Sequence, residues 1–147
     1  MVEYPRRMRH DVPSWVNPGE IYHIRMRTAP KNVVALTDPT IGASLLESAA
    51  FYHDTLRWRL RCLLLMPDHL HALIGFFPDQ RMSTVVGAWK VFNTRRSGIF
   101  WQTGYFDHRI RNTESLDVKL AYILRNPVVK GLCLNESDWP WTIEIRE

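Results

Sequence analysis

Residues 59–77 read RLRCLLLMPDHLHALIGFF, and this stretch decides the fold. Two runs of β-forming residues, 59–66 and 69–77, stand on either side of the turn-forming pair Pro67-Asp68. Such a pattern is typical of a β-hairpin with a tight turn. We expect both strands of this hairpin to be central in a sheet, with the remaining elements arranged around them.

His69 and His71 are the candidate metal ligands of the hairpin. Side chains two apart on a strand share a face, so the two imidazoles project together while Leu70 points into the opposite layer. Two imidazoles on one face make half of a metal site, and a third protein group is needed to complete it. A pair of half-exposed strand histidines without a ligand is the alternative that this motif alone leaves open.

Outward from the hairpin, the hydrophobic periodicity predicts one strand and one helix before it and two helices after it. Capping and turn-forming residues set the expected bounds of these elements. The expected elements are an edge or half-buried strand over 21–28, a helix over 41–58 capped by Thr40, a helix over 83–96 capped by Ser83 and stopped by Gly98, and a third helix from about Thr113 that Asn126-Pro127 breaks or kinks.

This order, β, α, ββ, α, α, predicts an α+β fold in which helices pack on one antiparallel sheet of ferredoxin-like kind. The 147 residues suffice for one domain with its own core but not for two. The apolar fraction of 46% and the charged fraction of 23% are those of a folded globular protein. Residues 1–20, basic and interrupted by prolines, are expected to form an arm, and residues 21–147 a single domain.

Cysteine content and hydropathy indicate where the protein works. Two cysteines, Cys62 and Cys133, are too few for a disulfide scaffold or a cysteine zinc site and suit a reducing compartment. No stretch reaches the roughly 18 apolar residues of a membrane span, and the N-terminus lacks the apolar core of a secretion signal. We therefore expect a cytoplasmic protein, and its net charge of +4 at pH 7 favours an anionic partner.

A candidate nucleophile, Tyr122, lies on the third predicted helix. At 3.6 residues per turn, Ser115, Lys119, Tyr122 and Asn126 fall on one polar stripe, apart from the stripe of leucines and isoleucine that is expected to be buried. Tyr122 is therefore expected beside polar groups rather than in the core. A boundary tyrosine whose hydroxyl reaches water fits the same pattern, so the helix alone does not identify a nucleophile.

Together, the histidine pair and the tyrosine resemble those of HUH enzymes, which carry His-hydrophobic-His on a central strand and a nucleophilic tyrosine on a separate helix. The closer similarity is to REP-associated tyrosine transposases, and it spans about residues 21–142. The joint pattern is far more specific than any one motif. It consists of MPDHLH at 66–71, Lys90, WQTGYFDHRIRN at 101–112, YILRNPVVKGL at 122–132 and DWPW at 138–141.

The resemblance implies an RRM-like or ferredoxin-like HUH domain that cuts and rejoins single-stranded DNA through a 5′-phosphotyrosine on Tyr122. It also implies a divalent ion held by His69 and His71. Asn126, one helical turn after the tyrosine, is the expected third ligand, because a carboxamide oxygen suits Mg²⁺ or Mn²⁺.

His108 and Lys119 are accessory candidates for the same site. His108 is the runner-up for the third metal ligand or for a phosphate contact. A structural hydrogen-bonded pair with the neighbouring Asp107 is the alternative reading of that histidine.

The resemblance implies a DNA partner as well, since family members recognise short imperfect hairpins such as REP elements beside the cut. Monomeric and dimeric members both occur, so monomer versus homodimer stays open. Basic side chains are the candidate phosphate contacts. They are Arg6, Arg7, Arg9, Lys90, Arg95, Arg96, Arg109 and Arg111.

Two other functions compete with this prediction. A metallohydrolase that activates water would also use His-x-His, but such sites recruit further histidines and aspartates close by, whereas residues 72–76 are apolar. A catalytically inactive or domesticated nucleic-acid-binding module of the same fold is the other alternative, and the sequence does not separate it from the enzyme.

Overall fold

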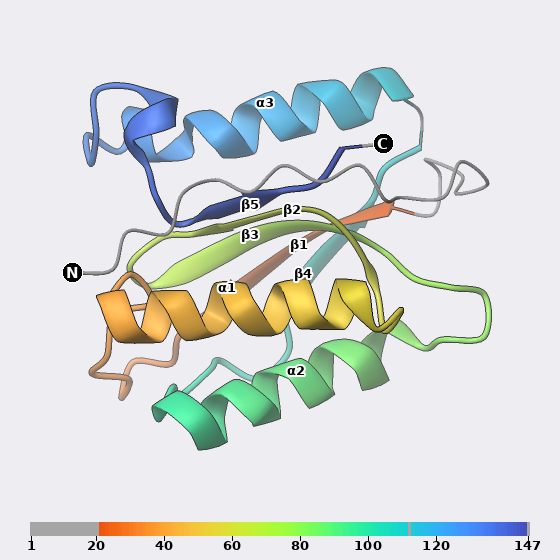
Figure 1. Cartoon of the computed structure of the whole chain (residues 1–147), viewed down its shortest axis with the longest axis horizontal. Coiled ribbons are helices and arrows are strands. Elements are labelled where there is room, and N and C mark those ends of the chain that lie inside the picture. The colour runs from red at the N-terminus through yellow and green to blue at the C-terminus, as the bar shows by residue number, and fades with distance from the viewer. Residues whose placement is uncertain (1–20, 112, 147) are drawn as a thin grey trace.

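A five-stranded antiparallel sheet lies between two layers of helices in the computed structural model, which describes residues 21–111 and 113–146 (Figure 1). The strand order is β4-β1-β3-β2-β5, so the predicted α+β, ferredoxin-like arrangement is confirmed, with β5 added at one edge. The elements are, in chain order, β1 (Ile21–Arg27), α1 (Pro39–Asp54), β2 (Arg59–Leu65), β3 (His69–Gly75), α2 (Met82–Ser97), β4 (Phe106–Arg109), α3 (Thr113–Val129), the 3₁₀ helix η2 (Glu136–Asp138) and β5 (Thr142–Glu144).

The hairpin of β2 and β3 is the centre of the sheet, as its sequence predicts. β3 pairs with β1 on one side and β2 on the other, and β2 also pairs with β5. A backbone hydrogen bond of 2.8 Å from the N–H of Met66 to the carbonyl of His69 closes the turn. An irregularity between Leu60 and Cys62 shifts the register. By the ordinary alternation of a strand, β2 presents apolar side chains to both faces of the sheet.

β1 lies inside the sheet, between β3 and β4, and the prediction of an edge position is wrong. Its half-buried character is confirmed, because buried and partly exposed side chains interleave along it. The neighbour that the sequence analysis missed is β4. All four β4 residues are exposed, so β4 lacks the apolar alternation by which a strand is recognised in a sequence.

α1 begins at Pro39 and is capped by Asp38 rather than by Thr40. The Asp38 carboxylate accepts hydrogen bonds of 3.1 Å from the backbone N–H groups of Thr40 and Ile41, and Pro39 at the first helical position needs no such partner. The helix ends at Asp54, four residues before the predicted end at Trp58. The indole of Trp58 packs back into the core and donates to the carbonyl of Ala49 over 3.1 Å.

α2 begins at Met82, so the predicted cap, Ser83, lies inside the helix. Arg81 occupies the cap position and makes no side-chain capping bond. The predicted stop is confirmed, since Gly98 ends the helix with φ +71°, a left-handed conformation that glycine adopts without strain.

α3 passes through Asn126-Pro127 and continues to Val129, so the predicted break is absent. Proline removes one backbone donor and one helical hydrogen bond. Here the loss falls in the last turn of the helix, where the N–H of Lys130 still donates to the carbonyl of Asn126 over 3.0 Å. The helix therefore carries Tyr122 and Asn126 on one continuous segment.

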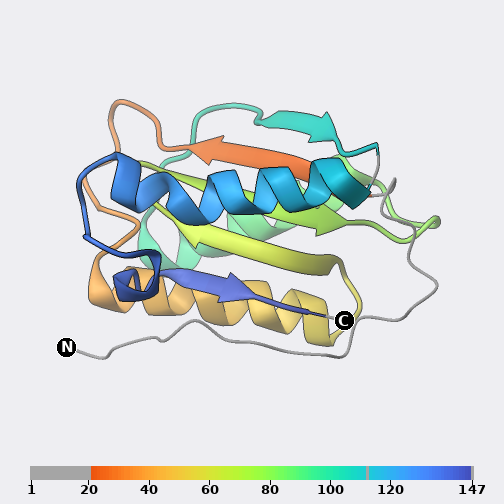
Figure 2. The ribbon, with the colours of Figure 1, turned by 90° about the horizontal axis from the view of Figure 1, so that it is seen from above.

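The two faces of the sheet bury two separate cores. α1 and α2 cover one face, and α3 crosses the middle of the other, which leaves β4 and β5 at the edges beyond it (Figures 1 and 2). The α1/α2 core is the larger and contains Trp58 and Trp89. The buried residues of the smaller α3 core are Ile21, Cys62, Leu64, Met66, Leu73, Ile110, Leu116, Ile123 and Leu124.

Within the described residues, no helix is both long and apolar enough to cross a bilayer.

Candidate active site

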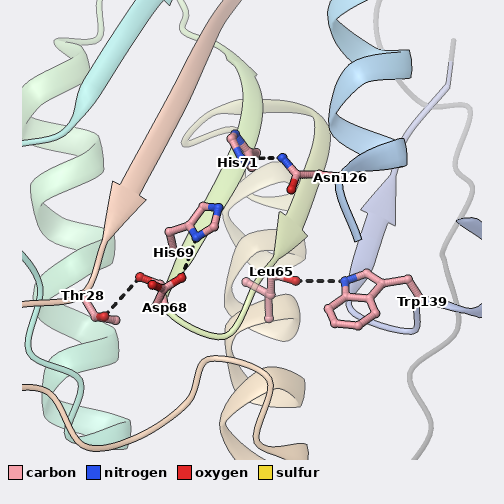
Figure 3. A network of polar contacts seen from close by, with 7 residues as sticks. All are labelled: Thr28, Leu65, Asp68, His69, His71, Asn126 and Trp139. Atoms are coloured by element: carbon pink, nitrogen blue, oxygen red, sulfur yellow. Dashed lines mark hydrogen bonds and ion pairs between the residues drawn. The ribbon is translucent and has the colours of Figure 1, made fainter. Parts of the chain in front are cut away.

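The two histidines of β3 face α3, on the side of the smaller core. Their ring centroids are 5.1 Å apart and their planes meet at 82°. His71 is buried, and the side chain of His69 is 12% exposed. Figure 3 shows the two imidazoles, and Leu70 between them in the sequence lies in the α1/α2 core, so the predicted separation is confirmed.

Asp68 fixes the orientation of His69. Its carboxylate Oδ1 lies 2.7 Å from Nδ1 of His69, and this hydrogen bond is the main reason why the pKa of Asp68 is lowered. A carboxylate accepts, so a ring proton lies on Nδ1, and in the neutral form of the ring the lone pair is on Nε2. The backbone carbonyl of Asp68 is held in turn by the N–H and the hydroxyl of Thr28, at 3.0 and 3.1 Å (Figure 3).

His71 lies between Asn126 of α3 and His23 of β1. Nδ2 of Asn126 is 3.2 Å from Nε2 of His71, and Nε2 of His23 is 3.0 Å from Nδ1 of His71. All three side chains are buried. The carboxamide oxygen of Asn126 is also buried, and it has no hydrogen-bond partner among the described residues.

Both buried histidines are neutral at physiological pH. Burial, followed by the charges of His69, His23 and nearby arginines, lowers the pKa of His71 to about 3. Burial, followed by Lys119, Arg25 and His108, lowers the pKa of His23 to about 4. A neutral imidazole is the form that binds a metal ion, so His71 needs to lose no proton to act as a ligand.

Tyr122 lies at the rim of this group, one turn before Asn126 on α3. The residue is 59% exposed, and the centroid of its ring is 6.3 Å from that of His71, with the planes at 89°. Nζ of Lys119 lies 5.5 Å from the centroid of the tyrosine ring. The structure thus brings together His69, His71, Tyr122 and Asn126, as the sequence analysis expects.

The donor set suits a hard divalent cation. Nε2 of His69 and of His71 both face away from the groups that hold their Nδ1 atoms. In the structure the nitrogen of the Asn126 carboxamide faces Nε2 of His71. Half a turn about the Cβ–Cγ bond would place the unpartnered carboxamide oxygen there instead. Two imidazole nitrogens and one carboxamide oxygen form a mixed donor set, in which the oxygen suits Mg²⁺ or Mn²⁺.

His108 lies outside this group. It is exposed on β4, opposite His23 in the register of β1 and β4, and is therefore two strands away from β3. Its neighbour Asp107 points to the other face of the sheet, because adjacent strand residues alternate. The predicted third-ligand role of His108 has no geometric support here.

Three of the predicted phosphate contacts lie on α2, across the sheet from the helix that carries Tyr122. Lys90 donates to the backbone carbonyls of Gln102 and Gly104, over 3.0 and 2.9 Å, and so holds the loop before β4. Arg95 and Arg96 end α2, on the opposite side of the sheet from α3 (Figure 1). Arg109 and Arg111 are exposed at and beyond the end of β4. Arg6, Arg7 and Arg9 lie outside the described residues.

An open strip of the sheet beside α3 was missed by the sequence analysis. Arg25 and Phe106 are paired across β1 and β4, and the guanidinium carbon lies 4.9 Å from the ring centroid. Phe106 is 45% exposed, and Arg27 is exposed two residues further along β1. The alternation of β1 indicates that Arg25 and Arg27 share a face. The pairing of β1 with β3, which places both arginines beside the two histidines, cannot be read from the sequence.

Comparison with known proteins gives a family and two relatives. The family model described as "Transposase IS200 like" matches residues 19–126. The REP-associated tyrosine transposase of Escherichia coli K12 is 30% identical over 89 residues, which is 58% of this chain and 53% of that protein. A protein of Haemophilus influenzae that carries the same name provisionally is 30% identical over 98 residues, 54% of this chain and 55% of that protein.

Among solved structures, a REP-associated tyrosine transposase bound to a REP hairpin matches with a TM-score of 0.72 and 22% identity. The match covers 90% of this chain and 81% of that one. At this identity the similarity establishes the fold. The chain spans about half the length of the two relatives that it matches by sequence, 53% and 55%.

Proposed function

The chain belongs to the family of IS200-like transposases, and from that premise we propose that it cuts and rejoins single-stranded DNA through a covalent bond to Tyr122. The observation that carries this proposal is the convergence of two distant segments. The ring of Tyr122 on α3 lies 6.3 Å from that of His71 on β3, with Asn126 against the same histidine. A phosphate within reach of the phenol would also be within reach of the histidines.

The group of ligands would hold a divalent ion, which supplies Lewis-acid chemistry at a phosphate oxygen and aligns the phosphate for in-line attack. His69 and His71 would bind it through Nε2, and Asn126 through its carboxamide oxygen. The buried, neutral state of His71 and the unpartnered oxygen of Asn126 support this assignment. Asp68 contributes by keeping the Nε2 lone pair of His69 directed at the site.

Tyr122 would act as the nucleophile. Its phenol must lose a proton as the oxygen attacks, and the departing 3′ oxygen takes up a proton. The ammonium of Lys119, 5.5 Å from the ring centroid, favours negative charge in this region. The phenol oxygen bonds to phosphorus, the bond to the 3′ oxygen breaks, and the products are a 5′-phosphotyrosine and a free 3′-hydroxyl. Because the phosphotyrosine conserves the bond energy, attack by a 3′-hydroxyl reverses the step without a nucleoside triphosphate.

The strip formed by Arg25, Arg27 and Phe106 would carry the strand that enters the site. It combines positive charge with an exposed aromatic ring, the two features by which proteins hold single-stranded DNA. It also lies on the same face of the sheet as His71, since Arg25 pairs with His71 across β1 and β3. Because the solved relative binds a REP hairpin, we propose a hairpin with a single-stranded flank as the substrate.

A covalent-adduct assay tests the proposal. The protein is incubated with Mn²⁺ and single-stranded oligonucleotides that form imperfect hairpins, and the adduct is located by mass spectrometry. We expect an adduct on Tyr122, none in Tyr122→Phe, and an unchanged adduct in the matched control Tyr105→Phe, whose tyrosine packs against the α1/α2 core. DNA binding should survive in Tyr122→Phe. An adduct that persists in this variant would exclude Tyr122, and binding without any adduct in the wild type would identify a binding module.

A further inference from the structure

His23 is a buried histidine that the sequence analysis did not single out, and it lies directly behind His71. Nε2 of His23 is 3.0 Å from Nδ1 of His71, and the two rings are within 20° of parallel. The ring of Phe106, on β4, packs edge-on against His23 with the centroids 5.7 Å apart. Contacts from both neighbouring strands therefore hold the His23 ring in place.

The hydrogen bonds around His71 define where its proton lies. Nδ2 of Asn126 carries only donor hydrogens, so at 3.2 Å it donates to Nε2 of His71. A neutral imidazole has a single N–H, which must then be on Nδ1 of His71 and must donate to Nε2 of His23. By the same rule, the proton of His23 lies on Nδ1, which is buried and has no hydrogen-bond partner among the described residues.

We infer that His23 is a positioning residue that presets His71 for metal binding, an inference that rests on the proposed function. A metal ligand that binds through Nε2 needs its proton on Nδ1, and His71 has this tautomer because His23 accepts from Nδ1. Half a turn of the Asn126 carboxamide then exposes the lone pair of Nε2 to the ion and leaves the His23–His71 bond unchanged. Binding therefore requires no rearrangement of the imidazole.

A carboxylate, Asp68, supports His69, whereas an imidazole, His23, supports His71. The difference follows from how exposed each partner is. Asp68, which supports His69, is 71% exposed, and water offsets its charge. A carboxylate at position 23 would carry a charge into a buried place beside the core, which is costly without a full set of partners. A neutral imidazole accepts the same hydrogen bond without that charge. The unpartnered Nδ1–H of His23 itself lowers stability, which fits a side chain retained for the site rather than for the fold.

Two substitutions separate positioning from packing. His23→Gln keeps an acceptor near the place of Nε2, whereas His23→Leu fills the space and offers none. His108→Leu is the matched control, because that histidine is exposed on the neighbouring strand. Mn²⁺ affinity is measured by electron paramagnetic resonance, the tautomer of His71 by ¹⁵N NMR of the metal-free protein, and folding by circular dichroism.

We expect His23→Leu to bind Mn²⁺ about 10- to 100-fold more weakly, as is typical when the partner behind a ligand histidine is lost. His23→Gln should retain most of the affinity, and His108→Leu all of it. In the wild type, the NMR spectrum should place the His71 proton on Nδ1. If His23→Leu does not fold, the comparison of His23→Gln with the wild type and the NMR spectrum still decide the question.

Three results would overturn the inference: wild-type affinity in a folded His23→Leu, equal losses in the two variants, or a His71 proton on Nε2. A separate outcome concerns the proposed function. If the wild type binds Mn²⁺ with the expected dependence on His23 but forms no adduct on Tyr122, the nuclease proposal fails and the positioning role remains. If the wild type binds no Mn²⁺ at all, the metal site fails, and the inference fails with it.

Discussion

The face of the sheet that α1 and α2 cover buries two tryptophans, Trp58 and Trp89, while the face that α3 covers buries His23, His71 and Asn126. The first face has a continuous apolar core that extends into both helices. The second has a smaller core next to two buried histidines and a buried carboxamide, which lie within hydrogen-bonding distance of one another. Apolar burial stabilises and polar burial costs free energy, so one face accounts for the fold while the other supports the proposed chemistry.

Removal of the metal should produce the largest effect. We expect it to abolish cleavage, which depends on the site under α3, and to leave the α1/α2 core unchanged. With EDTA, or in His69→Ala, we expect cleavage of a labelled hairpin oligonucleotide to fall by roughly a thousandfold or more, because the phosphate loses its Lewis acid. Mn²⁺ added back should restore the wild type but not His69→Ala. Thermal unfolding should change little in either case. Cleavage that continues in excess chelator would contradict the proposed mechanism.

The apolar face should show the converse behaviour. Trp89→Ala removes a fully buried side chain from the α1/α2 core and should lower the free energy of unfolding by about 3–5 kcal/mol. Tyr122→Ala, at a residue that is 59% exposed, should change the free energy of unfolding by no more than about 0.5 kcal/mol. Urea denaturation measures both. Equal losses in the two variants would remove the distinction between the faces.

Acid should weaken the fold through the α3 face. The unfolded chain has histidines of ordinary pKa, about 6.5, whereas the folded pKa values are about 3 for His71 and about 4 for His23. Below pH 6.5 the unfolded state binds protons first, so stability is full above that pH and falls as the pH decreases toward the folded values. At pH 5 the loss should approach about 2 kcal/mol for each histidine.

Urea titrations of the metal-free protein at pH 7 and pH 5 test this dependence. His71→Leu should show a smaller difference between the two pH values than the wild type. A pH dependence that is unaffected by His71→Leu would assign the effect to other groups.

The smallest predicted effect concerns DNA affinity. Arg27→Gln, on the open strip beside α3, should weaken single-stranded DNA binding by a few-fold. The slope of log affinity against log salt concentration should fall by about one, as expected for the loss of one phosphate contact. Lys90→Gln should leave affinity unchanged, because its ammonium is held by backbone carbonyls on the other side of the molecule. Fluorescence anisotropy at several salt concentrations compares them. A larger loss for Lys90→Gln would move the DNA path to the α2 side.

The histidine pair and the hairpin could be predicted because both depend on local rules. Strand alternation alone places His69 and His71 on one face and Leu70 on the other. The helical period places Asn126 one turn after Tyr122, and the resemblance then indicates its role. The matching family model and the two named relatives confirm that resemblance, while the metal ligands and the nucleophile stay predictions.

What could not be predicted depends on pairing between strands. His23 gains its importance from the register of β1 against β3, and β1 alone gives no sign of which residue will lie behind His71. β4 could not be predicted because its four residues are exposed and show no alternation of buried and exposed side chains. From the sequence, Lys90 is predicted to contact a phosphate. The fold shows that its ammonium donates hydrogen bonds to backbone carbonyls of the loop before β4.

Trp139 has a consequence for the order of events on the ribosome. Its indole donates to the carbonyl of Leu65 over 2.9 Å, and it packs against both cores just before β5 joins the edge of β2. These contacts hold the segment after α3 against the sheet (Figure 3). These contacts follow Tyr122 in the chain, so a ribosome adds Tyr122 before it adds the residues that hold the segment after its helix. We therefore expect the proposed active site to be completed only after the segment through β5 has been synthesised, later than the histidine strand.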